Sequence, residues 1–197
     1  GDGIGDLIIG GKLSSIRDIG AGAGYVLFGS KSGFNADVSL SGLDGGNGFR
    51  MDGGSRDDFL GWSVGSAGDM NGDGLGDVIV GAPLADAENN SSGSSYVVFG
   101  RTTGFDATLN LANLNGSDGF RLDSGEIRAL FGLSASGAGD VNGDGFDDVI
   151  IGAPNTDLRG TDSGSAYVVF GKASGFDSVM TLSELDGSNG FRLDGVG

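Results

Sequence analysis

The feature that most constrains this sequence is a repeat with a period of 71 residues. Many positions recur at this spacing, and the alignment of the three copies needs no gap. The recurring residues include Tyr25, Tyr96 and Tyr167; Phe28, Phe99 and Phe170; Phe34, Phe105 and Phe176; Phe49, Phe120 and Phe191; and Asp2, Asp73 and Asp144. Three full units of 71 residues would take 213, so the chain of 197 is 16 residues short. A tandem period of this length predicts an array of similar supersecondary units.

One unit, residues 59–123, has the pattern of four short strands. Apolar and polar residues alternate at its start, two runs rich in β-branched and aromatic residues follow, and a Gly-Phe-Arg-Leu-Asp segment ends it. The expected strands are residues 60–67, 77–82, 95–100 and 119–123. The connection that carries Leu109, Leu111 and Leu114 fits either a strand or one helical turn. Four antiparallel strands in about 65 residues, repeated in tandem, predict an all-β fold made of β-propeller blades.

Composition agrees with many tight turns and excludes several classes of partner. The chain has 43 glycines and only two prolines, and 38% of its residues are hydrophobic, so it is neither collagen-like nor disordered. The net charge of −16 leaves no basic surface for nucleic acid or for anionic lipid. No apolar run approaches the ~20 residues that a membrane-spanning helix needs. We therefore expect no nucleic-acid partner and no membrane insertion.

Two nine-residue loops have the composition of a site for a hard cation. Oxygen-bearing side chains stand at positions one, three, five and nine, glycine at position six allows a sharp turn, and the peptide carbonyl of position seven adds a ligand. The predicted Ca²⁺ ligands are Asp69, Asn71, Asp73, the carbonyl of Leu75 and Asp77 in one loop, and Asp140, Asn142, Asp144, the carbonyl of Phe146 and Asp148 in the other. Mg²⁺ is disfavoured because it retains its waters. A metal-free hairpin turn would not account for so many acidic groups, whose mutual repulsion is destabilising.

The second half of the same loop opens the chain. Asp2, the carbonyl of Ile4 and Asp6 match positions five, seven and nine. They predict a third, partial Ca²⁺ site, which requires ligands from a preceding segment. The chain is therefore interpreted as a segment of a longer polypeptide.

The residues available argue against catalysis. The chain has no histidine and no cysteine, which removes the commonest general base and two common nucleophile systems. Adjacent carboxylates occur at Asp57 with Asp58 and at Asp147 with Asp148, but such pairs in exposed loops are ordinarily just solvated. We therefore expect a structural ion and no enzymatic activity.

Several of these segments together resemble the FG-GAP repeat, the blade unit of the integrin α-subunit propeller. Phe-Gly at 131–132 opens a strand, the cation loop 140–148 follows, and Gly-Ala-Pro at 152–154 completes the signature. The added Gly-Phe-Arg-Leu-Asp segment is similar to bacterial members found in long secreted or surface proteins. The resemblance implies a closed ring of about seven blades.

The other two copies depart from this signature. Gly-Ala-Pro recurs at 81–83, but the loop of the second copy is preceded by Leu60-Gly61 and not by Phe-Gly. The first copy has Gly11-Lys12 where the others have Ala-Pro. The loop that follows Lys12 is therefore expected to differ in shape.

The resemblance divides residues 1–197 into parts of one propeller segment. Residues 1–52 would form a blade without its innermost strand, and residues 59–123 and 130–194 would form two whole blades. A ring closed by copies of this chain would lack that strand at every junction. The missing strand is therefore expected from the remainder of the longer chain or from neighbouring subunits.

The expected function is adhesion, protein or glycan binding, or surface-layer scaffolding by a secreted or cell-surface protein. Three loops differ most among the copies, residues 13–24, 84–95 and 155–166, and they would carry recognition or act as spacers. One alternative is an accessory propeller of a secreted hydrolase whose catalytic residues lie elsewhere. Another is a self-assembling extracellular structural subunit.

Two further features have structural interpretations. Arginine recurs two residues before aspartate on the last strand of each copy, so that both side chains face one side. The pairs are Arg50 with Asp52, Arg121 with Asp123, and Arg192 with Asp194. An ion pair between blades is favoured over a ligand-binding role. Trp62 occupies the position of Leu133 in the next copy and is expected in the core.

Overall fold

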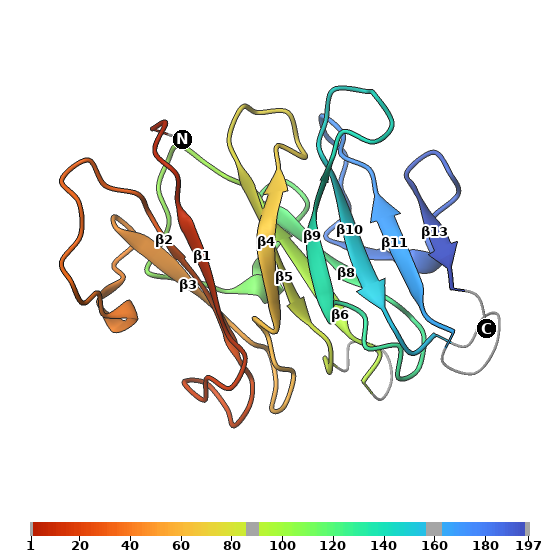
Figure 1. Cartoon of the computed structure of the whole chain (residues 1–197), viewed down its shortest axis with the longest axis horizontal. Helices are drawn as coiled ribbons and strands as arrows, with labels where there is room; N and C mark the ends of the chain where they lie inside the picture. The colour runs from red at the N-terminus through yellow and green to blue at the C-terminus, as the bar shows by residue number, and fades with distance from the viewer. Residues whose placement is uncertain (1, 86–90, 157–162, 196–197) are drawn as a thin grey trace.

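The computed structural model describes residues 2–85, 91–156 and 163–195. These residues form thirteen β-strands in three sheets, and their helices are three short 3-10 turns. The sheets stand side by side in chain order (Figure 1). Within those ranges, no helix has the length and apolar character needed to cross a membrane. The all-β prediction is confirmed.

The first sheet contains strands of the first copy and one strand of the second. Its strands are β1 (Leu7–Gly11), β2 (Ala23–Leu27), β3 (Gly48–Asp52) and β7 (Thr108–Leu109), in that order. The first three are antiparallel, whereas β7 pairs with β3 in parallel. The second copy therefore reaches back to cover the outer edge of the first.

The second sheet repeats this plan and has an additional inner strand. Its order is β4 (Ser63–Gly68), β5 (Asp77–Ala82), β6 (Ser94–Val98), β8 (Gly119–Asp123) and β12 (Val179–Thr181). The first four are antiparallel, and β12 of the third copy pairs with β8 in parallel.

The third sheet has the four antiparallel strands β9 (Ser134–Gly139), β10 (Asp148–Ala153), β11 (Ser165–Val169) and β13 (Gly190–Asp194). Among the described residues no parallel strand lies against β13. The outer edge of this sheet is therefore open where the corresponding edges of the other two are paired.

All four predicted strands are present, but only two have the expected bounds, since the third is Ser94–Val98 where 95–100 was predicted and the first begins later. β5 and β8 agree with the prediction at both ends, whereas β4 begins at Ser63 and not at residue 60. Phe59 and Gly61 have φ of 54° and 80°, values that an extended strand cannot accommodate. The sequence did not predict the parallel pairing of these short outer strands, because two or three residues give no periodic signal.

The leucine connection, for which a strand and a helical turn were both open, contains one of each. In the second copy β7 precedes the 3-10 helix η2 (Leu111–Asn113), in which the Asn110 side chain accepts the N–H of Ala112. The equivalent turns are η1 (Leu40–Gly42) and η3 (Leu182–Glu184).

Phenylalanine side chains of the second and third copies pack against the sheet before them. The Phe105 ring stacks on Phe49 with centroids 4.0 Å apart and planes 10° apart, and Phe176 stacks on Phe120 at 4.7 Å and 14°. The recurring phenylalanines therefore pack between successive copies at these two junctions.

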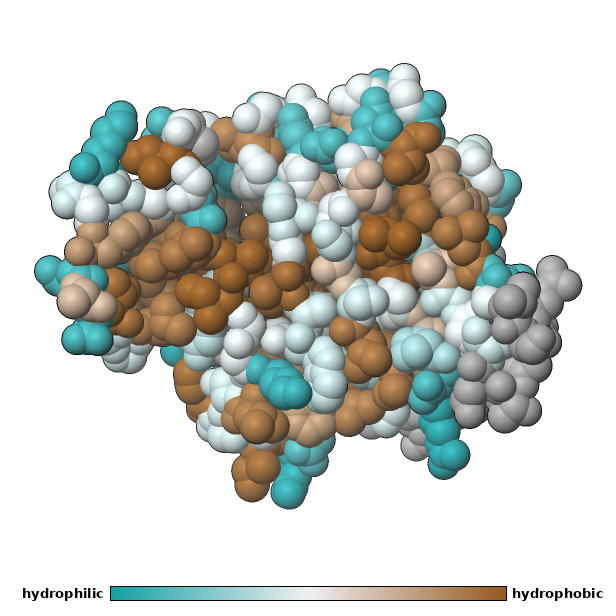
Figure 2. Space-filling view, viewed as in Figure 1, coloured by the Kyte–Doolittle hydropathy of each residue, from teal (hydrophilic) through white to brown (hydrophobic). Residues whose placement is uncertain are grey.

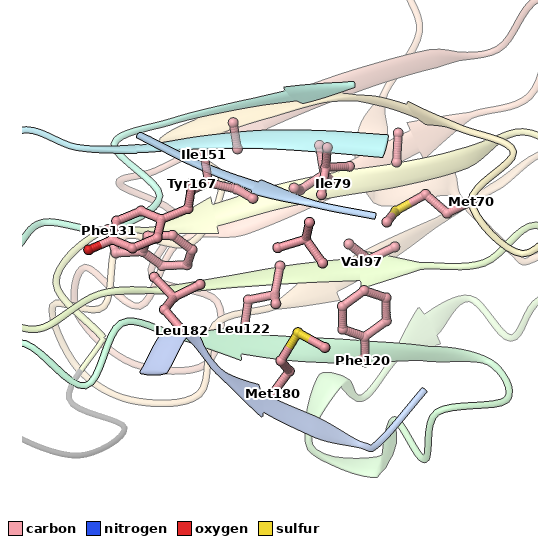
Figure 3. Close-up of a cluster of buried hydrophobic side chains, with 14 of the residues drawn as sticks. Met70, Ile79, Val97, Phe120, Leu122, Phe131, Ile151, Tyr167, Met180 and Leu182 are labelled. Atoms are coloured by element: carbon pink, nitrogen blue, oxygen red, sulfur yellow. The ribbon is translucent and has the colours of Figure 1, made fainter. Parts of the chain in front are cut away.

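The hydrophobic core lies between neighbouring sheets. Between the second and third sheets, Ile79, Phe120, Phe131 and Ile151 are fully buried, and Met180 of β12 closes one side (Figure 3). A second cluster fills the space between the first and second sheets. Each such side chain contributes about 1.5–3 kcal/mol of transfer free energy, so the junctions between sheets hold the array together.

Close approach of two backbones accounts for the glycine of Gly-Ala-Pro. A Cβ added to Gly81 would collide with the carbonyl oxygen of Gly132, which opens the next copy. Gly132 in turn donates its N–H to the Gly152 carbonyl at 3.1 Å. A side chain at position 81 would therefore separate the second sheet from the third.

The inner side of the first sheet is less covered than that of the others. In the described residues β1 is paired with β2 alone, and Leu7 is 56% exposed. Beside it lies a hollow of about 710 Å³, lined in part by Ile4, Ile8 and Phe28. Figure 2 shows apolar residues as a brown band across this side of the molecule.

Candidate metal centre

The two nine-residue loops lie at the same end of the array. Loop 69–77 joins β4 to β5, and loop 140–148 joins β9 to β10, both at the top of Figure 1. Gly74 and Gly145, at position six, have φ of 83° and 93°, a conformation that favours glycine. The sharp turn that the sequence predicted there is confirmed.

In loop 69–77 the polar side chains turn inward and bind the loop's own amides. The Asp69 carboxylate accepts the N–H groups of Asp73 and Gly74 at 3.0 and 2.9 Å. Asn71 Oδ1 also accepts the N–H of Asp73 at 3.0 Å, and Asp73 Oδ1 accepts that of Leu75 at 2.8 Å. These hydrogen bonds gather three oxygen-bearing side chains on the inside of the turn.

Asp77, at the ninth position, lies at the base of the loop and is 1% exposed. Its carboxylate accepts the N–H of Met70 at 2.9 Å and the N–H of Gly100, beyond the end of β6, at 2.8 Å. Its pKa is raised to about 7, first by burial and further by the carboxylates of Asp73 and Asp69, against the opposing effect of the two amides. A buried carboxylate close to two others is an environment that a cation would stabilise.

Loop 140–148 repeats these internal hydrogen bonds and adds one, from Gly143 to Asp140. The Asp140 carboxylate accepts the N–H groups of Gly143, Asp144 and Gly145 at 2.7, 3.1 and 2.9 Å. The Gly145 amide, with smaller help from the other two, holds the pKa of Asp140 below its usual range. Asn142 Oδ1 accepts the same Asp144 amide at 2.9 Å.

The end of loop 140–148 also matches that of the first loop. Asp144 Oδ1 accepts the N–H of Phe146 at 3.0 Å. Asp148 is fully buried and accepts the amides of Val141 and Gly171 at 2.8 and 2.9 Å, as Asp77 does with its counterparts. The two loops are therefore built alike at both ends.

The partial loop at the start of the chain shares two of these features. Asp6 Oδ1 accepts the N–H of Gly29 at 2.8 Å, which matches the bond from Gly100 to Asp77. Asp2 Oδ1 accepts the N–H of Ile4 at 3.0 Å. Position nine is thus fixed to the neighbouring strand in all three copies.

The donor set fits Ca²⁺, although the side chains are closed on their own backbone. Within the described part of the chain, no three His, Cys, Asp or Glu side chains are arranged closely enough to hold a metal ion. The oxygens that would bind one accept backbone amides, but each carboxylate oxygen has a second lone pair. All the predicted ligands are oxygens, the type that Ca²⁺ prefers. The assignment of these residues to Ca²⁺ stays a prediction.

The repeated Arg–Asp pairs lie within strands and not between blades. Arg121 contacts Asp123 at 2.7 Å on β8, and the buried Asp123 also accepts the hydroxyl of Ser94 at 2.7 Å. Equivalent pairs lie on β3 and β13. This network supports a structural role, because it satisfies a carboxylate that the sheet buries.

Trp62 is not in the core as predicted. It is 40% exposed, and the Lys12 ammonium lies 3.7 Å from its ring centroid. The alignment with Leu133 misled the prediction, because that position is itself only half-buried.

Asp147 was expected to be merely solvated, but it contacts the other loop. Its carboxylate accepts the N–H of Asp69, the first residue of loop 69–77, at 2.8 Å. Alignment of the three copies could have indicated this role, because the equivalent residues in the other two copies are Gly76 and Gly5, which have no side chain.

Comparison with known proteins identifies the repeats. The FG-GAP repeat model matches residues 60–98 and 131–169. The chain is 40% identical over 94 residues to integrin alpha pat-2 of Caenorhabditis elegans, 33% over 132 residues to integrin alpha-4 of Xenopus laevis, and 30% over 113 residues to integrin alpha-6 of Homo sapiens. These alignments cover 48, 66 and 57% of this chain but 7, 12 and 9% of those relatives. The chain therefore contains FG-GAP repeats, and its sheets are blades of a β-propeller.

Proposed function

We propose that this chain is a calcium-stabilised, non-enzymatic segment of an extracellular β-propeller with a role in adhesion. The carrying observation is that FG-GAP repeats occur together with two oxygen-lined loops, each ending in a buried aspartate at the base of a hairpin. Similarity to integrin α subunits supports a surface location and an adhesive role. The blade limits 1–52, 59–123 and 130–194 belong to the same proposal.

The proposed ligands are those predicted from the sequence. Asp69, Asn71, Asp73 and Asp77, with the carbonyl of Leu75, would hold one ion, and their counterparts in loop 140–148 a second. Asp2, the Ile4 carbonyl and Asp6 would contribute to a third. The ion supplies positive charge where carboxylates converge, and Asp77 links it to β6 through Gly100. Its role would be to tie the tip of each hairpin to the adjacent strand.

Calcium titration with thermal unfolding tests this proposal. We expect two strong Ca²⁺ sites by calorimetry, and a rise in Tm of roughly 5–10 °C for each site at 100-fold excess over Kd. Asp73→Ala and Asp144→Ala should each remove one site, whereas Asp37→Asn, an exposed change outside the loops, should remove none. Unchanged melting in excess EGTA, together with no bound metal by elemental analysis, would refute the proposal.

The loop of residues 13–24 is the proposed recognition element. Leu13, Ile16 and Ile19 are 68, 55 and 58% exposed on it, so that three large apolar side chains of one loop are open to solvent. The loops 84–95 and 155–166 contain residues outside the described ranges. We expect a triple serine substitution at these three positions to abolish binding to immobilised extracellular-matrix proteins or glycans while Tm stays unchanged. Binding that persists in the triple variant would exclude the loop.

The uncovered ends of the array favour further blades as partners. Phe105 and Phe176 stack on the preceding sheet, whereas the equivalent Phe34 is 53% exposed. Phe191, which would accept such a ring, is 36% exposed. These surfaces would be covered by the remainder of a longer chain or by neighbouring subunits. Light scattering with and without Ca²⁺ distinguishes the two, because only the second predicts assembly of the 197-residue chain.

A further inference from the structure

The two complete loops are in direct contact through one residue. Asp147 Oδ2 accepts the N–H of Asp69 at 2.8 Å, and the N–H of Asp147 donates to the Asp69 carbonyl at 3.1 Å. The two residues therefore form a reciprocal pair of hydrogen bonds across the junction between the second and third sheets. Asp69 is the first proposed ligand of loop 69–77.

Other atoms of the third copy enclose the same part of loop 69–77. The Phe146 ring lies against Gly72, where an added Cβ would collide with it. The N–H of Lys172 donates to the Met70 carbonyl at 2.8 Å. The first half of loop 69–77 thus takes its shape partly from the blade that follows it.

The position of Asp147 in its own loop connects this contact to a second ion. Its neighbours on both sides, Phe146 and Asp148, are proposed ligands in loop 140–148. An ion held by the Phe146 carbonyl and the Asp148 carboxylate would fix the backbone on both sides of Asp147.

We propose that Asp147 is a positioning residue that couples the two loops, so that Ca²⁺ in loop 140–148 raises the affinity of loop 69–77 for Ca²⁺. This inference rests on the proposed calcium function. Without the first ion, loop 69–77 must order both itself and its neighbour when it binds. With that ion present, part of the ordering entropy has already been lost, and the second ion binds more tightly. Because coupling between binding free energies is reciprocal, each loop strengthens the other by the same factor.

Calorimetric Ca²⁺ titration of the whole chain, with the partial loop silenced by Asp6→Asn in every variant, measures the coupling. We expect the parent to bind two ions with positive cooperativity. Asp144→Ala should leave one site, loop 69–77. Its affinity for Ca²⁺ should be about 5- to 20-fold weaker than that of the second Ca²⁺-binding step of the parent. Asp73→Ala should weaken loop 140–148 by the same factor.

Replacement of Asp147 tests the residue itself. Asp147→Ala should leave two sites that bind independently, and adding Asp144→Ala to it should no longer change the affinity of loop 69–77. The equivalent Gly76 shows that this loop position tolerates the loss of a side chain. Asp147→Asn retains an oxygen acceptor for the Asp69 amide and should keep the cooperativity. Asp37→Asn removes the same charge from an exposed site and should behave as the parent.

The outcomes separate this inference from the calcium proposal. If the parent binds no Ca²⁺, the calcium proposal fails and the coupling fails with it. If the parent binds two ions independently, the calcium proposal stands and the coupling is wrong. If cooperativity survives Asp147→Ala in a variant whose circular dichroism is unchanged, the assignment to Asp147 is wrong.

Discussion

Loops 69–77 and 140–148 have nearly the same sequence pattern but opposite surroundings. Met70 is fully buried, whereas Val141, at the same position, is 50% exposed. A Cβ on Gly68 would collide with Asp147, but one on the equivalent Gly139 would have no neighbour within 4 Å. In the described structure loop 69–77 is covered by the copy that follows it, the third. Within that structure no following copy covers loop 140–148.

The outer edges of the sheets differ in the same way. On the Gly-Phe-Arg-Leu-Asp strand of the second copy, Phe120 is buried under β12 and Phe176. On the same strand of the third copy, the equivalent Phe191 is 36% exposed. The environment of a residue in this array is therefore set by the copy that follows it. Equivalent substitutions in successive copies should have different effects, which provides matched controls within one chain.

The largest contrast is expected at these two phenylalanines. Phe120→Ala removes a fully buried ring and its stacking on Phe176, and it should lower the free energy of unfolding by about 3–5 kcal/mol. Phe191→Ala should lower it by about 1 kcal/mol, because that ring is already partly in solvent. Urea unfolding at saturating Ca²⁺ measures both. Equal losses would mean that β13 is covered in solution.

Much of the fold could be predicted because its signals are periodic. The 71-residue spacing, the β-branched runs and the acidic loops each repeat, so that β5 and β8 were located to the residue. The parallel pairing of β7 and β12 could not be predicted. They are short, and their partners are strands of another copy, which composition within a segment does not reveal.

The sequence predicted the local shape of the candidate site but not the contacts that its loops make with other copies. Position and residue type were enough to predict the turns at Gly74 and Gly145. The contact from Asp147 to Asp69 spans 78 residues and depends on how two blades pack. The environment of Trp62 likewise includes a contact from another copy, since the Lys12 ammonium lies over its ring.

A smaller contrast is expected at the aspartates that follow the same phenylalanines. Asp123→Ala leaves Arg121 and the buried hydroxyl of Ser94 without their partner, and it should destabilise by about 2–3 kcal/mol. The Asp194 side chain is 17% exposed and the Arg192 side chain 41%, so Asp194→Ala should cost about 1 kcal/mol.

Thermal and urea unfolding of the two single variants gives this comparison. The double variant Ser94→Ala with Asp123→Ala should lose less than the sum of the single losses, because the two groups share one hydrogen bond. Additive losses would show that the bond between Ser94 and Asp123 contributes nothing to stability.

The smallest contrast isolates the contact between the two loops. Gly68 and Gly139 have φ of 78° and 70°, so alanine should impose about the same backbone penalty of 1–2 kcal/mol at either position. Gly68→Ala must also displace the Asp147 carboxylate, which should add about 1 kcal/mol that Gly139→Ala does not suffer. In an Asp147→Gly background the additional loss should disappear, since the Cβ and the carboxylate that obstruct position 68 are both gone. Urea unfolding in EGTA measures the difference without any contribution from bound ions. If Gly68→Ala and Gly139→Ala lose the same stability, Asp147 does not rest against loop 69–77 in solution, and the contrast between the covered and the open loop is lost at its central contact.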